Sequence, residues 1–247
     1  MNILNVPVLK RLYPSIVRRY LMLIGKFKNE IEINNLKFEI DIRESIERKT
    51  YFLKKYEEKR MDQLFLYSRK NVSNIFIDVG ANIGFYSVLF SDKFRRVYSF
   101  EPNKRNFLVL NKNINKNKLT NIETFNFGLG DKIEILKGHS NTKGELFQTS
   151  GFAVSKSSNV GADVLIKKGD DVLQFNNENI TLKIDVEGFE LFVLKGLEKT
   201  LINNCCILQI EIWEKNNEDV QRFLKMLNYK MMCSIDGDTY FSNKLIK

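Results

Sequence analysis

The sequence predicts an α/β fold whose core is a doubly wound, mostly parallel β-sheet. Short apolar runs alternate with segments of helical periodicity, a glycine turn follows the first run, and several runs end in an acidic residue. The apolar runs, typical of strands buried on both faces, lie at 75–77, 97–100, 122–127, 181–186 and 207–213. This alternation indicates parallel strands joined by helices, with ligands at the carboxyl ends of the strands.

The chain has 247 residues, which suits one such domain, expected at 71–247, behind an N-terminal extension at 1–70. Within the domain, residues 132–180 are less regular, and strands are expected there only at 133–136 and 164–166. We expect this insertion to shape the substrate site, because such loops commonly carry specificity. After it, helices are expected at 191–201 and 220–227, and closing strands at 230–234 and 239–241.

The extension contains three expected segments. Pro14 begins a predicted amphipathic helix that runs to about Phe27, since proline is accepted in a first helical turn. The peptide IEINNLKFEI predicts a hairpin that turns at Asn34-Asn35, and 43–69 is charged and favours helix. The first helix has a broad apolar face opposite basic side chains. It can therefore rest on an anionic membrane through residues 14–28. The alternative, slightly favoured, is that it packs on the domain or on a second subunit.

Composition limits the partners without choosing one. The net charge is +9, from 39 Lys and Arg against 30 Asp and Glu, which permits nucleic acid, an acidic polysaccharide or a phospholipid surface as a partner. The lysines are interleaved with asparagines along the whole chain, so a solvated basic surface is favoured. No stretch is apolar enough to span a bilayer, and the three cysteines indicate reduced thiols. We expect a cytoplasmic protein, with any membrane contact peripheral.

The turn after the first apolar run predicts the cofactor. It reads Gly80-Ala81-Asn82-Ile83-Gly84, so Asn82 replaces the middle glycine of the dinucleotide pattern and its side chain takes the room that diphosphate needs. The Asn82 amide can instead bond a ligand carboxylate, and Asp78 suits an ammonium group. Glu101 follows at the distance where a carboxylate accepts both ribose hydroxyls. An amino acid joined to adenosine is S-adenosylmethionine. The alternative is a tight turn that Asp78 merely caps.

Two further acidic clusters end neighbouring strands. They are Lys183 to Glu190, read as KIDVEGFE, and Gln209 to Trp213, read as QIEIW. Carboxylates at the ends of adjacent parallel strands converge on one cleft, and a buried acid there needs a partner or a task. The alternative for Asp185 is that it caps the following helix. For Glu190, a structural role at the positive helix N-terminus is favoured.

These motifs carry a resemblance. FIDVGANIGFYS, SFEPN and LKIDVEGFELFVLKGL together resemble the FkbM-type S-adenosylmethionine-dependent methyltransferases, with the seven-stranded class I Rossmann-like fold. The resemblance runs from about Tyr56 to near the C-terminus and excludes the first roughly 30 residues. It implies that the turn holds the methionine end of the cofactor, the acid the ribose, and 127–129 the adenine. The implied cofactor residues are Asp78, Gly80, Ala81, Asn82, Gly84, Glu101, Pro102, Phe127 and Gly128.

The resemblance also implies O-methylation, commonly of sugar hydroxyls, which here means a glycan, a glycolipid or a related metabolite. Asp185 is the first candidate for the base or the substrate-orienting group, and Glu211 is the second. His139, in a loop predicted at 138–141, is the third. Asp185, Glu187 and Glu211 can alternatively offer oxygen ligands to Mg²⁺.

Two other functions stay open at this point. One is methylation of RNA ribose or cap, which the positive charge favours; the sequence has no stacking-aromatic motif within a basic run, so a nucleic-acid partner is not favoured. The other is a binding protein that keeps the fold without turnover. The intact turn and acids count against it.

Overall fold

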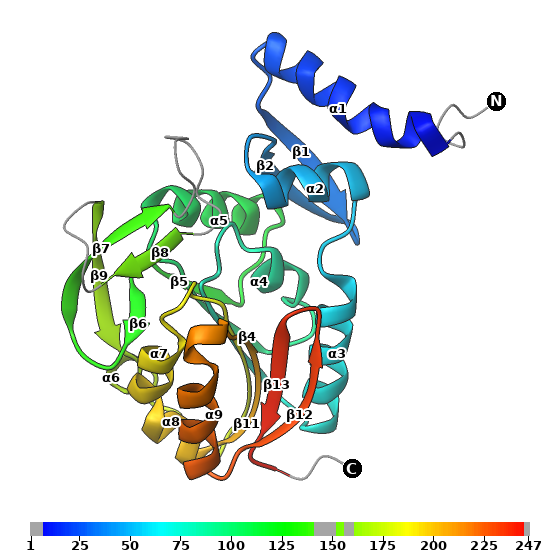
Figure 1. Cartoon of the computed structure of the whole chain (residues 1–247). Helices are drawn as coiled ribbons and strands as arrows, with labels where there is room; N and C mark the ends of the chain where they lie inside the picture. Colours follow the sequence, from blue (N-terminus) through cyan, green and yellow to red (C-terminus); the bar gives the residue numbers. More distant parts are fainter. Residues whose placement is uncertain (1–6, 141–151, 156–160, 245–247) are drawn as a thin grey trace.

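The structure, a computed structural model, describes residues 7–140, 152–155 and 161–244 (Figure 1). Its centre is a sheet of seven strands, mostly parallel as predicted. Five neighbouring strands are parallel, and β13 is antiparallel to both of its neighbours. In spatial order the strands are β12 (Lys230–Ile235), β13 (Asp238–Ser242), β11 (Cys205–Glu211), β10 (Asn179–Ile184), β3 (Ile75–Val79), β4 (Arg96–Phe100) and β5 (Ile122–Phe125). The predicted fold class is confirmed.

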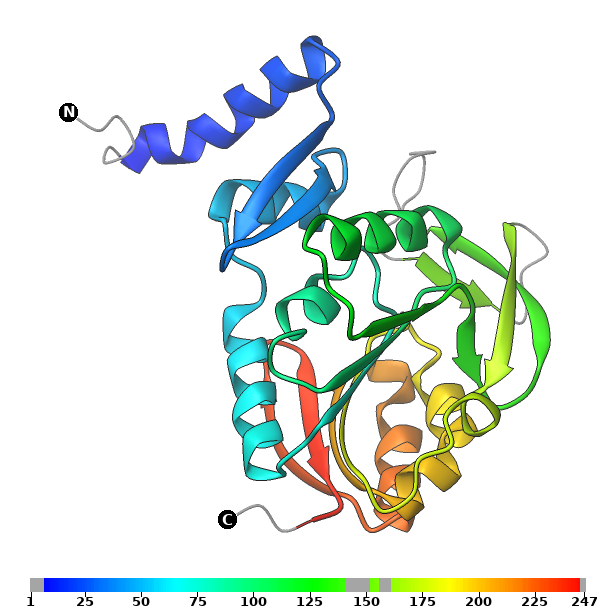
Figure 2. The ribbon, with the colours of Figure 1, turned by 180° about the vertical axis from the view of Figure 1, so that it is seen from behind.

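Helices cover both faces of this sheet (Figures 1 and 2). Strand β3 is buried along its whole length because its alternate residues enter two apolar clusters: Ile75, Ile77 and Val79 enter one, and Phe76 the other. This explains why the strand is apolar throughout. One face carries α3 (Glu58–Lys70), α4 (Phe85–Leu89) and α5 (Lys104–Lys116); the other carries α6 (Gly169–Val172), α7 (Glu190–Gly196), α8 (Glu198–Asn203) and α9 (Asn217–Met226), which follows the short 3₁₀ turn η2 (Glu214–Asn216).

The N-terminal segments follow the predictions with two corrections. The hairpin is confirmed as β1 (Lys28–Ile33) and β2 (Leu36–Asp41), since Asn34 and Asn35 both adopt the positive φ that a tight hairpin turn needs. The first helix, α1, spans Pro7–Leu23, so Pro14 lies inside it and not at its start. The charged segment forms two helices, α2 (Ser45–Leu53) and α3, separated at 54–57.

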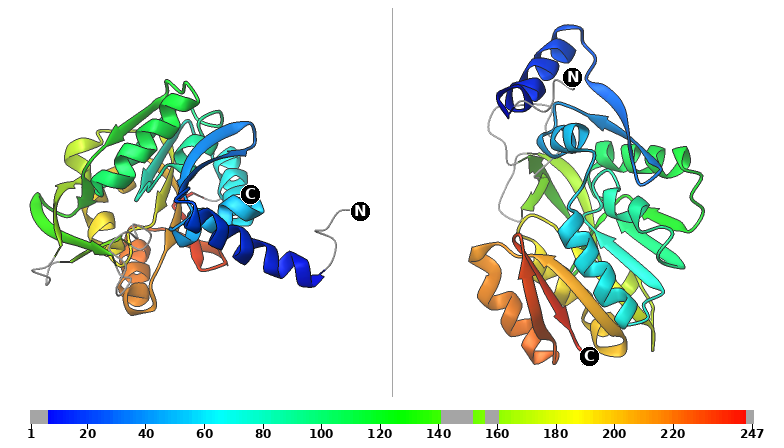
Figure 3. Two further views of the ribbon diagram at one scale, coloured as in Figure 1. Left: turned by 90° about the horizontal axis from the view of Figure 1, so that it is seen from above. Right: turned by 90° about the vertical axis from the view of Figure 1, so that its right-hand side faces the viewer.

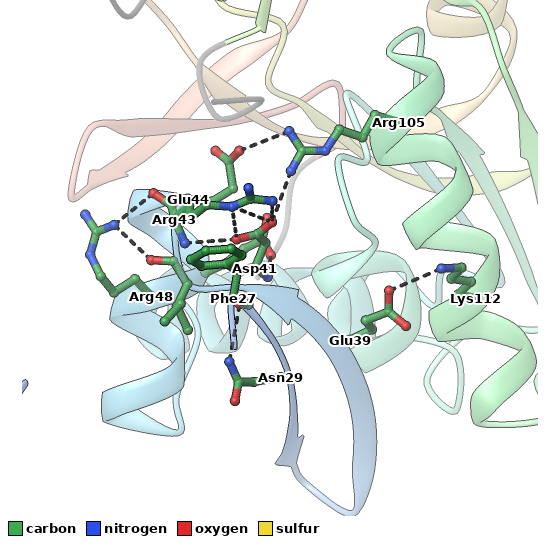
Figure 4. A network of polar contacts seen from close by, with 11 residues as sticks. Phe27, Asn29, Glu39, Asp41, Arg43, Glu44, Arg48, Arg105 and Lys112 are labelled. Carbon is green, nitrogen blue, oxygen red and sulfur yellow. Dashed lines mark hydrogen bonds and ion pairs between the residues drawn. The ribbon is translucent and has the colours of Figure 1, made fainter. Parts of the chain in front are cut away.

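The hairpin is fastened to α5 by ion pairs (Figure 4). The carboxylate of Asp41 lies 3.2 Å from Arg105 of α5 and also pairs with Arg43, and Glu39 lies 3.2 Å from Lys112. Apolar side chains of the hairpin belong to the same buried cluster as Phe76 of the central sheet. The hairpin therefore extends the core of the sheet. Leu21, near the end of α1, is buried in the same cluster, whereas the earlier part of α1 projects away from the domain (Figure 3).

The insertion forms a second, four-stranded sheet in the order β6-β9-β7-β8. Its strands are β6 (Gly128–Gly130), β9 (Ala162–Lys168), β7 (Glu134–Ser140) and β8 (Phe152–Ser155). The predicted strands at 133–136 and 164–166 are confirmed in type and are longer than expected. The loop predicted at 138–141 is wrong at His139, which lies within β7 opposite Ala153. Pairing with β8 and β9 outweighs the low strand propensity of the glycine and serine beside it.

Candidate active site

A cleft of about 180 Å³ opens at the carboxyl ends of β3, β4, β10 and β11. Most of the predicted site residues line it: Asp78, Gly80, Ala81, Asn82, Glu101, Pro102, Gly128, Asp185 and Glu211. Three do not: Gly84, Phe127 and His139. The lining also includes side chains that the sequence did not single out, among them Tyr56, Glu57 and Arg60 before and within α3, and Phe152 and Val154 of β8.

The two glycines of the turn, Gly80 and Gly84, are required for different physical reasons. Gly80 has φ +84°, and a Cβ built on it would stand 1.9 Å from the backbone carbonyl oxygen of Asp185, so only glycine lets β3 end this close to the chain after β10. Gly84 has φ +91°, and its Cβ would stand 2.4 Å from Leu110 of α5. Gly80 thus lets the turn after β3 contact the segment after β10, whereas Gly84 lets the turn pack against α5.

Phe127 likewise serves packing. Its ring is 5.8 Å from that of Phe100 and 5.5 Å from that of Phe125, and the ammonium of Lys167 lies 4.4 Å from its centre. The neighbouring Gly128 and Leu129 line the cleft in its place. The sequence predicted that 127–129 lines the cleft, but it carries no signal for which of these three residues face it.

Glu101 is held by two backbone amides at the end of β4. Its carboxylate accepts hydrogen bonds from the N–H groups of Asn82 and Asn103, each at 2.7 Å. Burial nevertheless raises the pKa of Glu101 to about 7, with the two amide bonds acting in the opposite direction. Each carboxylate oxygen keeps a second lone pair for a ligand hydroxyl.

Asp78 and Asn82 present unpaired oxygens in the cleft. One oxygen of Asp78 accepts a 2.5 Å hydrogen bond from Ser87, and the other has no partner among the described residues although the side chain is almost fully buried. Burial raises the pKa of Asp78, while the Lys183 ammonium and Ser87 lower it. The side-chain oxygen of Asn82 is also buried without a partner in the part of the chain that the structure describes. A buried acceptor without a donor is costly, and a cationic ligand would satisfy it.

Lys183, Asp185 and Glu211 form one charged unit. The Lys183 ammonium is buried, donates to Asp185 at 2.8 Å and lies 4.8 Å from the centre of the Tyr86 ring. Burial opposes ionisation of Asp185, but Lys183 and a hydrogen bond from Glu211 keep its pKa below the ordinary value. The charge of Asp185, followed by burial, raises the pKa of Glu211 to about 9. At neutral pH Asp185 is therefore ionised and Glu211 is protonated.

Glu187 lies at the tip of a tight turn over the cleft. The turn closes with a 3.3 Å hydrogen bond from the Phe189 N–H to the Val186 carbonyl, and its central residues, Glu187 and Gly188, have φ +54° and +100°. The half-buried Glu187 carboxylate has no hydrogen bond or ion pair with the residues the structure describes. Burial, then the charges of Asp185 and Glu190, raises its pKa to about 7.

A polar network supports the floor of the cleft. The Tyr86 hydroxyl donates to Glu57 at 3.0 Å and accepts from Gln209 at 2.8 Å, and Arg60 pairs with Glu57 and Asp238. These contacts hold the start of α3 against β11 and β13. The spacing of single motifs carries no signal for this network, because its members come from four separate elements.

The acids do not fit a magnesium ion. Across residues 7–140, 152–155 and 161–244, no group of three or more His, Cys, Asp or Glu side chains is arranged to hold a metal. The Lys183 ammonium already occupies one oxygen of Asp185. In the same described residues, no helix combines the length and apolar character needed to cross a bilayer.

Comparison with known proteins decides the family. Residues 78–231, more than half of the chain, match the methyltransferase FkbM domain. The chain belongs to the FkbM family of methyltransferases. The resemblance predicted from the three motifs is confirmed, and so is the class of enzyme.

Two relatives are informative. The chain is 31% identical over 131 residues to the hexuronic acid methyltransferase AglP of Haloferax volcanii, and the match covers 50% of each protein. It thus spans about half the length of this curated relative. The crystal structure of a methyltransferase FkbM from Methylobacillus flagellatus KT superposes with a TM-score of 0.50 at 19% identity, covering 69% of this chain and 43% of that one. This second likeness concerns the fold.

Proposed function

We propose that this FkbM-family protein is an S-adenosylmethionine-dependent O-methyltransferase that acts on a sugar hydroxyl of a glycan, a glycolipid or a related metabolite. The observation that carries the proposal is the pair of acids flanking the Gly80 turn. Asp78 offers an unpaired buried oxygen to an ammonium group, and Glu101 offers lone pairs to ribose hydroxyls. The relative AglP is described as a hexuronic acid methyltransferase, which favours a sugar acceptor.

The residues present fit the cofactor. Asp78, Gly80, Ala81 and Asn82 would hold its amino-acid end, and Glu101 its ribose. When bound, S-adenosylmethionine supplies a methyl group that its positive sulfur makes electrophilic. The apolar side chains of Phe152 and Val154 line the same cleft and would exclude water from it. Ionised Asp185, fixed by Lys183, would orient the acceptor by accepting a hydrogen bond from one of its hydroxyls. Such alignment can supply about 7–11 kcal/mol of the barrier.

The binding half of the proposal is tested by calorimetry with S-adenosylmethionine and S-adenosylhomocysteine. We expect binding of both in the micromolar range and a loss of affinity in Asp78→Asn, which keeps the shape of the side chain and removes its charge. Glu123→Gln, an exposed acid on strand β5 of the same sheet, is the matched control. No heat with either ligand would contradict the proposal.

The acceptor half is tested with S-adenosylmethionine carrying a labelled methyl group. UDP-glucuronic acid, p-nitrophenyl glucuronide, UDP-glucose and RNA serve as acceptors. We expect a methyl ether, stable to mild alkali, on one of the sugars. An alkali-labile methyl ester would place the methyl group on a carboxylate, and label in RNA alone would contradict a sugar acceptor.

We further propose that α1 rests on an anionic membrane surface. Ile16, Tyr20 and Leu23 lie along one side of the helix and are 61%, 61% and 87% exposed, and Arg18 and Arg19 are also exposed. Apolar side chains with basic neighbours suit the interface of an anionic bilayer. In the chain, α1 is followed by the hairpin and then by α2, and Ile46 of α2 lines the cleft. An α1 bound to a membrane would therefore hold the cleft near lipid-linked sugars.

Vesicle co-sedimentation tests this contact. Vesicles of phosphatidylcholine with phosphatidylglycerol should bind the protein, and vesicles of phosphatidylcholine alone should bind it less. Leu23→Glu should abolish binding, whereas Ile202→Glu on α8, also an exposed apolar residue, should not. Equal binding by both variants would exclude α1 as the contact.

A further inference from the structure

The two acids expected to act as a base are poorly suited to remove a proton. Asp185 is paired with the Lys183 ammonium at 2.8 Å, so its negative charge is already compensated. Glu211 is protonated at neutral pH because it stands beside that charge. Both side chains can orient a ligand. Neither takes up a proton readily at neutral pH, because Asp185 is held in its ionised form and Glu211 already carries a proton.

Glu187 is better suited to remove a proton. It lines the cleft two residues after Asp185, and its carboxylate has no hydrogen bond or ion pair with any described residue. Its backbone has φ +54° at a turn position where glycine, asparagine and aspartate normally occur. A left-handed conformation costs free energy for glutamate, and such costs recur at functional sites. The turn thus holds an unpaired carboxylate over the cleft at the expense of local stability.

Glu190 and Asn216 fix this turn. The buried Glu190 carboxylate accepts from the Gly188 N–H at 2.6 Å, and the Asn216 amide donates to the Gly188 carbonyl at 2.8 Å and to Glu190 at 3.2 Å. These are positioning contacts, because they act on the backbone beside Glu187 and not on a ligand.

We propose that Glu187 is the general base for the acceptor hydroxyl; this rests on the proposed O-methyl transfer. The hydroxyl O–H bond breaks and its proton passes to a Glu187 oxygen. The electron pair of the broken O–H bond stays on the acceptor oxygen and forms the new bond to the methyl carbon of S-adenosylmethionine. At the same time the electron pair of the bond between that carbon and sulfur stays on sulfur. The products are the methyl ether and S-adenosylhomocysteine, and Glu187 then releases the proton to water.

The charges around Glu187 suit this task near neutral pH. Asp185 and Glu190 favour its protonated form and Lys183 favours its ionised form, and with burial the pKa lies at about 7. A base is most effective when its pKa is close to the working pH. Glu187 is then ionised in a large share of molecules and still binds a proton readily.

The test compares Glu187→Gln with wild type and with Glu198→Gln, an exposed acid on α8. With the acceptor methylated by wild type, we expect kcat of Glu187→Gln to fall by about 10²–10⁴-fold while its calorimetric affinity for S-adenosylhomocysteine is unchanged. At saturating S-adenosylmethionine, where the affinity for the cofactor no longer limits the rate, the wild-type kcat should rise with pH and level off above about pH 7, and this inflection should vanish in Glu187→Gln. An unchanged rate and pH profile would overturn the proposal.

A second measurement needs no acceptor. Carbon-13 NMR of glutamate-labelled protein should show a carboxyl that titrates near pH 7 and is absent from Glu187→Gln. A Glu187 carboxyl with an ordinary pKa would overturn the role of Glu187 whatever the acceptor is. Absence of any cofactor binding by wild type would instead defeat the proposed function, so the two failures are distinguishable.

Discussion

Gly80 lies against the backbone carbonyl of Asp185, and this contact joins two sides of the cleft, the turn after β3 and the segment after β10. The Asp185 N–H donates back to the Val79 carbonyl at 3.0 Å, so the ends of β3 and β10 are locked together at this point. The turn proposed to bind the cofactor and the acid proposed to orient the acceptor therefore have a fixed relative position.

Gly80→Ala should disrupt both sides at once. The added methyl group would stand 1.9 Å from a backbone oxygen, and the positive φ adds about 1 kcal/mol or more. We expect a lower melting temperature and at least a tenfold weaker affinity for S-adenosylhomocysteine. Gly25→Ala is the matched control, since Gly25 also has positive φ but its Cβ would meet no atom within 4 Å. Equal losses in both variants would show that the contact with Asp185 is unimportant.

Glu101→Gln should weaken cofactor binding by about 10- to 100-fold, because hydrogen bonds to a charged group contribute about 1.5–3 kcal/mol each. The ionised form is the better acceptor, and its pKa is about 7. The affinity of wild type for S-adenosylhomocysteine should therefore fall as the pH drops from 8 to 6. That of Glu101→Gln should change less. A parallel pH dependence of the two proteins, measured by calorimetry, would exclude Glu101 as its source.

The sequence was a good guide where local signals decide structure. The Gly80 turn, the acid at Glu101 and the Asn34-Asn35 hairpin could be predicted because positive φ and strand ends leave local marks. The protonation states of the acids in the cleft could not be predicted from the sequence. They depend on the charges around Asp185, which follows β10, and Glu211, which ends β11. No motif spacing gives the separation of these two residues.

The insertion shows the same limit. Gly138-His139-Ser140 has little strand character, and its place in β7 depends on pairing with β8 and, at Gly138, also with β9. Phe152 reaches the cleft by the same long-range pairing. Tyr56 reaches it from the segment before α3 and stacks on Phe85 at 4.2 Å. Such contacts between distant segments follow from the assembled fold, which single motifs do not encode.

Lys183→Met should destabilise the protein by about 3–5 kcal/mol, because it leaves the Asp185 charge without its partner. Asp185→Asn in the same chain should recover part of this loss. A double-mutant cycle in urea denaturation measures the coupling, expected at about 0.5–3 kcal/mol. Strictly additive effects of the two substitutions would contradict the 2.8 Å ion pair as a stabilising contact.

Glu47→Gln should stabilise the protein at pH 8. Glu47 is buried in α2 and accepts from the Asp41 N–H at 2.5 Å, and burial raises its pKa from 4.5 to about 8. The folded state thus binds a proton that the unfolded state has released, so wild type loses stability as the pH rises from 4.5 to 8.

Glutamine keeps a carbonyl acceptor for the Asp41 amide and cannot ionise. The two proteins should be equally stable at or below pH 4.5 and should diverge above it, with a difference at pH 8 of at least about 1.4 kcal/mol, the equivalent of one pKa unit. Urea denaturation across this range measures the difference, and Glu58→Gln, at an exposed position of α3, controls for loss of a surface charge. The carboxyls of the cleft, which Glu47 does not line, also titrate, but they are common to all three proteins and cancel in the comparison. A constant difference across the pH range would mean that Glu47 is not the titrating group.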